Sequence, residues 1–115
     1  MAKTIYKIVP ASLWQKAKAT GIFEGAAIDL SDGFIHFSTA AQAKETAARH
    51  FAGQTDLLLV AVDGEALGER LVYEPSRGGD LFPHLYAALP LSAVLWEKPL
   101  SLGPDGAHQF PEMPL

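Results

Sequence analysis

The sequence contains no cysteine among its 115 residues. Disulfide bonds, thiolate nucleophiles and zinc sites built on cysteine are therefore excluded together. The longest aliphatic run, LLLVAV at residues 57–62, is far shorter than the roughly 20 apolar residues that a membrane-spanning helix needs. The N-terminal stretch MAKTIYKIVP holds two lysines but no apolar segment of signal-peptide length. We therefore expect a cytoplasmic protein with no membrane partner.

Positive charge is also scarce. The chain has 9 lysines and arginines against 13 aspartates and glutamates, which gives a net charge of −4 at pH 7. A protein that binds duplex nucleic acid or an anionic membrane surface usually carries a basic face, and this sequence has no basic cluster. Duplex nucleic acid is therefore not an expected partner.

The motifs of several enzyme classes are missing as well. The sequence has no Walker loop, no GxGxxG and no GxSxG, so P-loop hydrolysis, Rossmann cofactor binding and α/β-hydrolase chemistry have no support. It has no HExxH motif either. A metal site made from His36, Glu74 and His84 would need ligands from three separate segments, and we expect no metal.

The sequence does contain the pattern of one α+β domain, residues 1–100, followed by a C-terminal tail, residues 101–115. Apolar and β-branched runs predict strands at residues 4–9, 33–38, 56–63, 70–74 and 93–100. Residues 82–89 fit either a strand or a helix, and residues 22–32 are predicted to be mostly loop.

Two helices are predicted early in the chain. A capping box at Ser12 and Gln15 opens the first, which Gly21 ends, and Thr39 with Gln42 opens the second, which Gly53 ends. Strands outnumber helices, which favours an α+β arrangement over a regular βαβ winding.

The stretch GFIHFST places a histidine in an otherwise apolar strand. Period-two alternation puts Phe34, His36 and Ser38 on one face. An imidazole beside the hydroxyls of Ser38 and Thr39 suits a sugar hydroxyl, a carboxamide or a phosphate oxygen. The alternative is a core histidine bonded within the sheet, with Ser38 or Thr39 only capping the next helix. Both interpretations stay open.

A second stretch, FPHLY, has similar chemistry. If it is extended, Phe82, His84 and Tyr86 share a face, and Pro83 indicates an edge or irregular segment where ligand sites are often built. The alternative is that Tyr86 is a core aromatic residue with its hydroxyl satisfied at the rim.

Glu74 borders the one loop of the domain that is dense in proline and glycine, residues 75–79, and Arg77 lies within it. Glu74 is either a catalytic carboxylate or the ion-pair partner of Arg77. Arg77 and the backbone amides of Gly78 and Gly79 are expected to meet a phosphate group of a ligand.

The order of these segments over residues 4–98 resembles the domain-of-unknown-function family 952: IYKIV, a Trp-containing helix, GFIHFST, a helix, an aliphatic strand and FPHLY. That family is similar in fold to the ADP-ribosyltransferase-like superfamily. The resemblance implies a small split sheet, antiparallel or mixed, whose two parts enclose a cleft that holds NAD. It implies that His36 and Ser38 bind the nicotinamide ribose and carboxamide. It also implies that Tyr86 stacks on the nicotinamide and that Glu97 activates the acceptor. Phe37 stands where active relatives usually have glycine.

The hypothesis is a nucleotide-sized cleft that serves a divergent ADP-ribosyl transferase, a glycosyltransferase-type enzyme, or an NAD or ADP-ribose binder. The expected catalytic residues are His36, Glu74 and His84. Ligand contacts are expected from Ser38, Thr39, Arg77, Phe82 and Tyr86. One alternative is a non-catalytic small-molecule binding module. Another is a phosphoesterase that uses His36, because IHFST resembles one copy of the His-x-Ser/Thr motif of two-histidine phosphoesterases.

Overall fold

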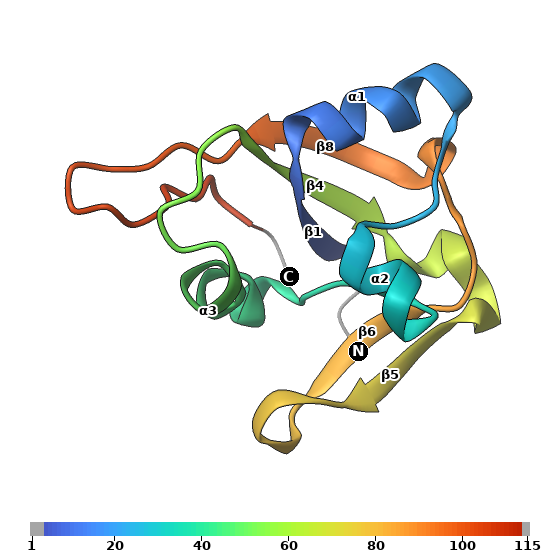
Figure 1. Ribbon diagram of the computed structural model, residues 1–115. Helices are drawn as coiled ribbons and strands as arrows, with labels where there is room; N and C mark the ends of the chain where they lie inside the picture. The colour runs from blue at the N-terminus through green and yellow to red at the C-terminus, as the bar shows by residue number, and fades with distance from the viewer. Residues whose placement is uncertain (1–3, 114–115) are drawn as a thin grey trace.

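A computed structural model describes residues 4–113, which form an α+β fold of small antiparallel sheets (Figure 1). The first sheet has the strand order β1-β4-β8, made of β1 (Thr4–Pro10), β4 (Leu57–Asp63) and β8 (Val94–Pro99). The second has the order β3-β6-β5, made of β3 (Ile35–His36), β6 (Leu81–Leu85) and β5 (Leu71–Pro75). A two-stranded pair joins β2 (Ile22–Phe23) to β7 (Leu89–Pro90). The α+β prediction is confirmed, and every strand pair within the described residues is antiparallel.

The helices cover both faces of the first sheet. They are α1 (Ala11–Thr20), α2 (Ala27–Asp32) and α3 (Ala40–His50), with short 3-10 helices η1 (Gly64–Arg70), η2 (Arg77–Gly79) and η3 (Leu91–Ala93). The short helix α2 contacts β3 of the second sheet. In Figure 1, α1 lies on one side of β1 and β4 and α3 on the other. Alternating residues of β1 therefore face two different cores.

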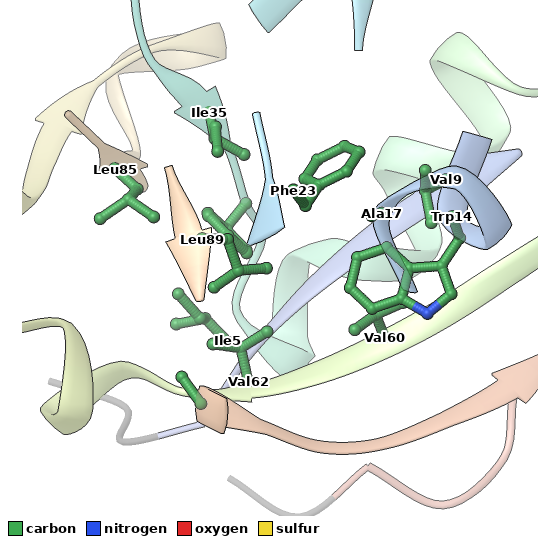
Figure 2. Close-up of a cluster of buried hydrophobic side chains, with 12 residues drawn as sticks. Ile5, Val9, Trp14, Ala17, Phe23, Ile35, Val60, Val62, Leu85 and Leu89 are labelled. Carbon is green, nitrogen blue, oxygen red and sulfur yellow. The ribbon is translucent and has the colours of Figure 1, made fainter. Parts of the chain in front are cut away.

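The larger core joins both three-stranded sheets to α1. Figure 2 shows Trp14 of α1 beside strand residues that include Val9 and Val60, and the rings of Trp14 and Phe23 have centroids 5.5 Å apart. From the second sheet, Ile35 reaches the same core. The smaller core lies under α3 and contains Tyr6, Ile8, Ala47, Leu57, Leu59, Ala61 and Leu100. One face of the second sheet therefore packs on the larger core. We call the opposite face its outer face, and packed side chains support any site there.

The predicted strand at residues 33–38 is shorter than expected. Only Ile35–His36 pairs with β6, because the backbone then crosses to the first sheet. The N–H of Phe37 donates to the carbonyl of Pro83 in β6, and the N–H of Ser38 donates to the carbonyl of Tyr6 in β1. Two consecutive residues are therefore hydrogen-bonded to two different sheets.

Three helix predictions need correction. Residues 22–32 contain β2 and α2 rather than mostly loop. The first helix begins at Ala11 directly after Pro10, so Ser12 lies inside its first turn and does not cap it. The second helix ends at His50, before the predicted stop at Gly53. The prediction for its start is confirmed, because the side chain of Gln42 accepts a hydrogen bond from the N–H of Thr39 at 3.0 Å.

The ambiguous stretch FPHLY is extended, in β6 and the residue after it. The tail after β8 folds back on the domain, where Leu102 pairs with His108 in an isolated bridge. Phe110 and Met113 pack against the smaller core. In the part of the chain that the structure describes, no helix is long and apolar enough to cross a membrane.

Candidate functional site

His36 lies on the outer face of the second sheet and is held by a buried carboxylate. Its neighbour Ile35 points into the core, so alternation turns the imidazole the other way. Nδ1 of His36 lies 2.6 Å from Oδ1 of Asp29, and the backbone N–H of His36 donates to the same oxygen. The second oxygen of Asp29 accepts from the N–H of Ala26 at 2.8 Å. Asp29 is 2% exposed, so α2 fixes one end of the imidazole from inside the protein.

A buried lysine completes this arrangement. Nζ of Lys7 lies 2.9 and 3.1 Å from the two oxygens of Asp29. Burial by itself would raise the pKa of Asp29, but the hydrogen bond from His36, the charge of Lys7 and two backbone amides lower it to about 2. Burial lowers the pKa of Lys7, and Asp29 opposes that shift. Asp29 is therefore ionised at neutral pH, and its contacts with Lys7 and His36 link α2 to β1 and β3.

The lowered pKa of Asp29 predicts a loss of stability in acid. Its ordinary value is 3.8 and its folded value about 2, so its contribution is complete above about pH 4 and disappears as the pH falls through 2. The contribution is about 2 kcal/mol, from the difference between the two values. Carbon-13 NMR of the Asp29 carboxyl should show a titration midpoint near 2. A midpoint near 4 would show that the contacts of Asp29 do not favour its ionised form.

The other end of the imidazole is open to solvent. Nε2 of His36 lies 2.9 Å from Oδ2 of Asp32, at the end of α2, and these side chains are 32% and 41% exposed. Both ring nitrogens of His36 thus face carboxylates. These two contacts are both hydrogen bonds only when each nitrogen carries a proton.

A second imidazole–carboxylate group lies beside the first. His84 of β6 is the register partner of His36, and their ring centroids are 5.5 Å apart. Oε1 of Glu74 lies 2.8 Å from Nδ1 of His84 and accepts the hydroxyl hydrogen of Tyr86 at 2.7 Å. The bond from Tyr86, and then that from His84, lower the pKa of Glu74, while the same carboxylate raises the pKa of Tyr86. Glu74 is thus an ionised acceptor with two donors.

Phe34 connects the two groups through its ring. Its centroid lies 4.1 Å from that of His84 in a stacked arrangement, 4.6 Å from that of His36 and 5.2 Å from that of Tyr86. These four rings form one aromatic cluster over β3 and β6, in which His84 is buried and Tyr86 is exposed. We call this cluster, with its flanking carboxylates Asp32 and Glu74, the two-histidine face.

The structure brings half of the eight predicted catalytic and ligand-binding residues together. His36, Glu74, His84 and Tyr86 lie on the two-histidine face, and Phe82, on the same side of β6 by alternation, is buried. For the other predicted residues, the contacts that the structure describes lie outside this face. The hydroxyl of Ser38 lies 2.9 Å from that of Thr46 in α3, away from His36.

The remaining predicted residues have other positions. Thr39 is the N-cap of α3. Arg77 begins η2, but its side chain lies outside the part of the chain that the structure describes. The N–H of Gly79 donates to the carbonyl of Ser76, so this amide is not free to meet a phosphate as predicted. Glu97 lies on β8 and pairs with Lys18 of α1 at 2.7 Å.

Sequence reasoning missed four residues of the site: Lys7, Asp29, Asp32 and Phe34. One signal for the first was present, because Lys7 shares a face of β1 with Ile5 and Val9, where a charge needs a partner. Its partner is 22 residues away, and no local pattern identifies it.

Two hollows lie elsewhere in the fold. One of about 390 Å³ lies between α3 and the C-terminal segment, with Ala47, Ala48 and Phe110 among its lining. The other, of about 260 Å³, lies beside Leu57 and Leu100. Neither includes His36 or His84.

Comparison with known proteins identifies the family. The model of the family described as "Protein of unknown function (DUF952)" matches residues 8–97. The crystal structure of protein CC0527 from Caulobacter crescentus is 55% identical, covers 92% of this chain and 93% of its own, and superimposes with a TM-score of 0.89. A solution NMR structure of CC0527 is 54% identical over 94% of this chain and 93% of its own, with a TM-score of 0.85. Among curated proteins, none matches. The chain belongs to the DUF952 family, whose function is not known.

Proposed function

We propose that the chain binds a nucleotide of the NAD or ADP-ribose class on the two-histidine face and acts there as a divergent ADP-ribosyltransferase-like transferase. The observation that carries the proposal is the pairing of His36 with His84. The two rings lie side by side, and each is held at Nδ1 by a carboxylate. Imidazole–carboxylate pairs of this kind are the usual groups for proton transfer.

The face also has the groups that a nucleotide needs. Tyr86 is 39% exposed, and its ring, which is tilted by 45° against that of Phe34, offers an aromatic face on which an adenine or nicotinamide ring can stack. The Nε2 end of His36 offers a hydrogen bond to a polar group of the sugar.

The proposed reaction breaks the bond between C1′ of the ribose and the nicotinamide nitrogen. Nicotinamide leaves with the bonding electron pair, and positive charge develops on the ribose. Glu74 is an ionised carboxylate, half-buried, and is placed to stabilise that charge while His84 and Tyr86 hold it. The acceptor then bonds to C1′ and gives up its proton. Nε2 of His36, the more exposed of the two imidazoles, takes that proton in the form of the ring whose Nε2 carries none.

The phosphoesterase alternative has one observation in its favour. Two adjacent imidazoles could act as base and acid on a phosphoester, and His36 with His84 provides them in register on neighbouring strands. A phosphoesterase would hydrolyse a phosphoester without releasing nicotinamide from NAD, so one assay separates the two reactions.

The test of binding is a titration of NAD, ADP-ribose and AMP followed by NMR. We expect millimolar ligand to shift the resonances of His36 and Tyr86, and His36→Ala or His84→Ala to weaken binding about tenfold, the loss of one good hydrogen bond. His50→Ala, at the end of α3, is the matched control and should leave binding unchanged.

Chromatographic detection of nicotinamide then tests the chemistry. Shifts together with nicotinamide release support a transferase or glycohydrolase reaction. Shifts without turnover of NAD or of a phosphoester would leave a binding module. If none of the three ligands shifts His36 or Tyr86, the protein has no nucleotide role at this face.

A further inference from the structure

We propose that Asp32 is a specificity-determining residue, which admits a neutral hydroxyl group to His36 and excludes phosphate. The inference rests on the proposed function and extends it, because it names which part of a nucleotide reaches the imidazole. It also bears on the phosphoesterase alternative, which needs a phosphate at the same nitrogen.

The two ends of the His36 imidazole differ in access. At Nδ1 the ring meets Asp29, whose side chain is buried and already accepts hydrogen bonds from Ala26 and Lys7. At Nε2 it meets Asp32, whose side chain is 41% exposed. The hydrogen-bonding atom that a ligand can reach is therefore Nε2, and the group beside it is Asp32.

The helix that carries Asp32 is anchored. The side chain of Asp29 accepts the N–H of Ala26 at the start of α2, and its carbonyl accepts the N–H of Gly33 at the end, at 2.9 Å. The ion pair with Lys7 ties the same residue to β1. Asp32 is thus held beside Nε2 by a structured segment rather than by a free loop.

A hydroxyl group and a phosphate group meet this pair differently. A hydroxyl can accept a hydrogen bond from Nε2 and donate its own hydrogen to Asp32, so it satisfies both partners. A phosphate at neutral pH offers mainly acceptor oxygens and places its charge within about 4 Å of the carboxylate of Asp32. Repulsion between like charges at that distance is enough to weaken binding about tenfold near a protein surface.

Among the contacts of the described residues, neither lysine nor arginine reaches Nε2 of His36, and the guanidinium of Arg70 is bonded to the carbonyl of Tyr86. The charge of Lys7 is buried against Asp29, on the far side of the imidazole. Glu74 adds a second carboxylate to the two-histidine face. Local charge therefore favours a sugar hydroxyl at His36 and places the phosphates of a nucleotide farther away.

The experiment compares adenosine with inorganic phosphate as probes, using NMR of the His36 imidazole in the full chain. In the unaltered protein we expect adenosine to shift His36 and phosphate to need at least tenfold higher concentration for a comparable shift. Asp32→Asn keeps the size and shape of the side chain and removes the charge. We expect it to strengthen phosphate binding at least fivefold at low salt, and the gain should shrink at 1 M salt, where charges are screened. Glu112→Gln removes a charge from the tail and should change neither affinity.

Each result decides the question. Phosphate that shifts His36 as readily as adenosine, or an Asp32→Asn variant with unchanged phosphate affinity, overturns the inference and leaves nucleotide binding intact. Adenosine that shifts His36 while NAD, ADP-ribose and AMP do not supports the inference and removes the proposed function. If neither probe shifts His36, the inference is overturned because the imidazole takes neither group.

Discussion

Replacing Asp29 with asparagine is expected to lower the free energy of unfolding by about 3–5 kcal/mol, the usual cost of leaving one charge of a buried ion pair without its partner. Lys7, which is buried beside Ile5 and Val9, would lose the carboxylate that opposes the lowering of its pKa by burial. His36 would lose the anion that holds its Nδ1. Urea unfolding at pH 7 measures the loss, with the slope of the transition as a check on two-state behaviour.

Two further variants show whether the charge is the cause. Asp32→Asn alters a half-exposed carboxylate on the same helix and should cost at most about 1 kcal/mol. Lys7→Met in the Asp29→Asn background removes the unpaired charge and should recover part of the lost stability. A cost below about 1 kcal/mol for Asp29→Asn would contradict the prediction.

Replacing Trp14 with alanine should have an effect of similar size. Trp14 is 1% exposed and packs on Phe23 in the core that joins both three-stranded sheets. The alanine variant loses the transfer free energy of a large aromatic side chain and leaves a cavity, which together cost about 3–5 kcal/mol. Thermal and urea unfolding followed by circular dichroism would measure it.

The control for this variant is on the surface of β8. Leu95 is an exposed apolar residue, and Leu95→Ala should change the free energy of unfolding by no more than about 0.5 kcal/mol. A Trp14→Ala variant as stable as Leu95→Ala would mean that the core collapses around the missing ring without cost.

The parts of the fold that follow from local pattern could be predicted from the sequence. The first strand and the LLLVAV strand have dense apolar side chains, and they form β1 and β4 close to the expected bounds. The start of α3 could be predicted because Thr39 and Gln42 interact across one helical turn.

The parts that depend on tertiary contact could not be predicted. The helix α2 has six residues, too few to be stable from propensity alone, and it is held by contacts of Asp29 with distant segments. The shortening of the strand at His36 depends on where the chain crosses between sheets. His36 and His84 are paired because of the register between β3 and β6. Neither sequence segment specifies that register by itself.

The pairing of β3 with β6 has a consequence for how the protein folds. The hairpin of β5 and β6 can form early, since its strands are close in sequence, and it brings only Glu74, His84 and Tyr86 together. The rest of the two-histidine face forms only when β3 pairs with β6, where the partners His36 and His84 lie far apart along the chain. The chain loses the entropy of closing such a large loop before the new contacts stabilise it, and this slows folding. The site is therefore a late product of folding, and no short excised fragment of the chain can contain it.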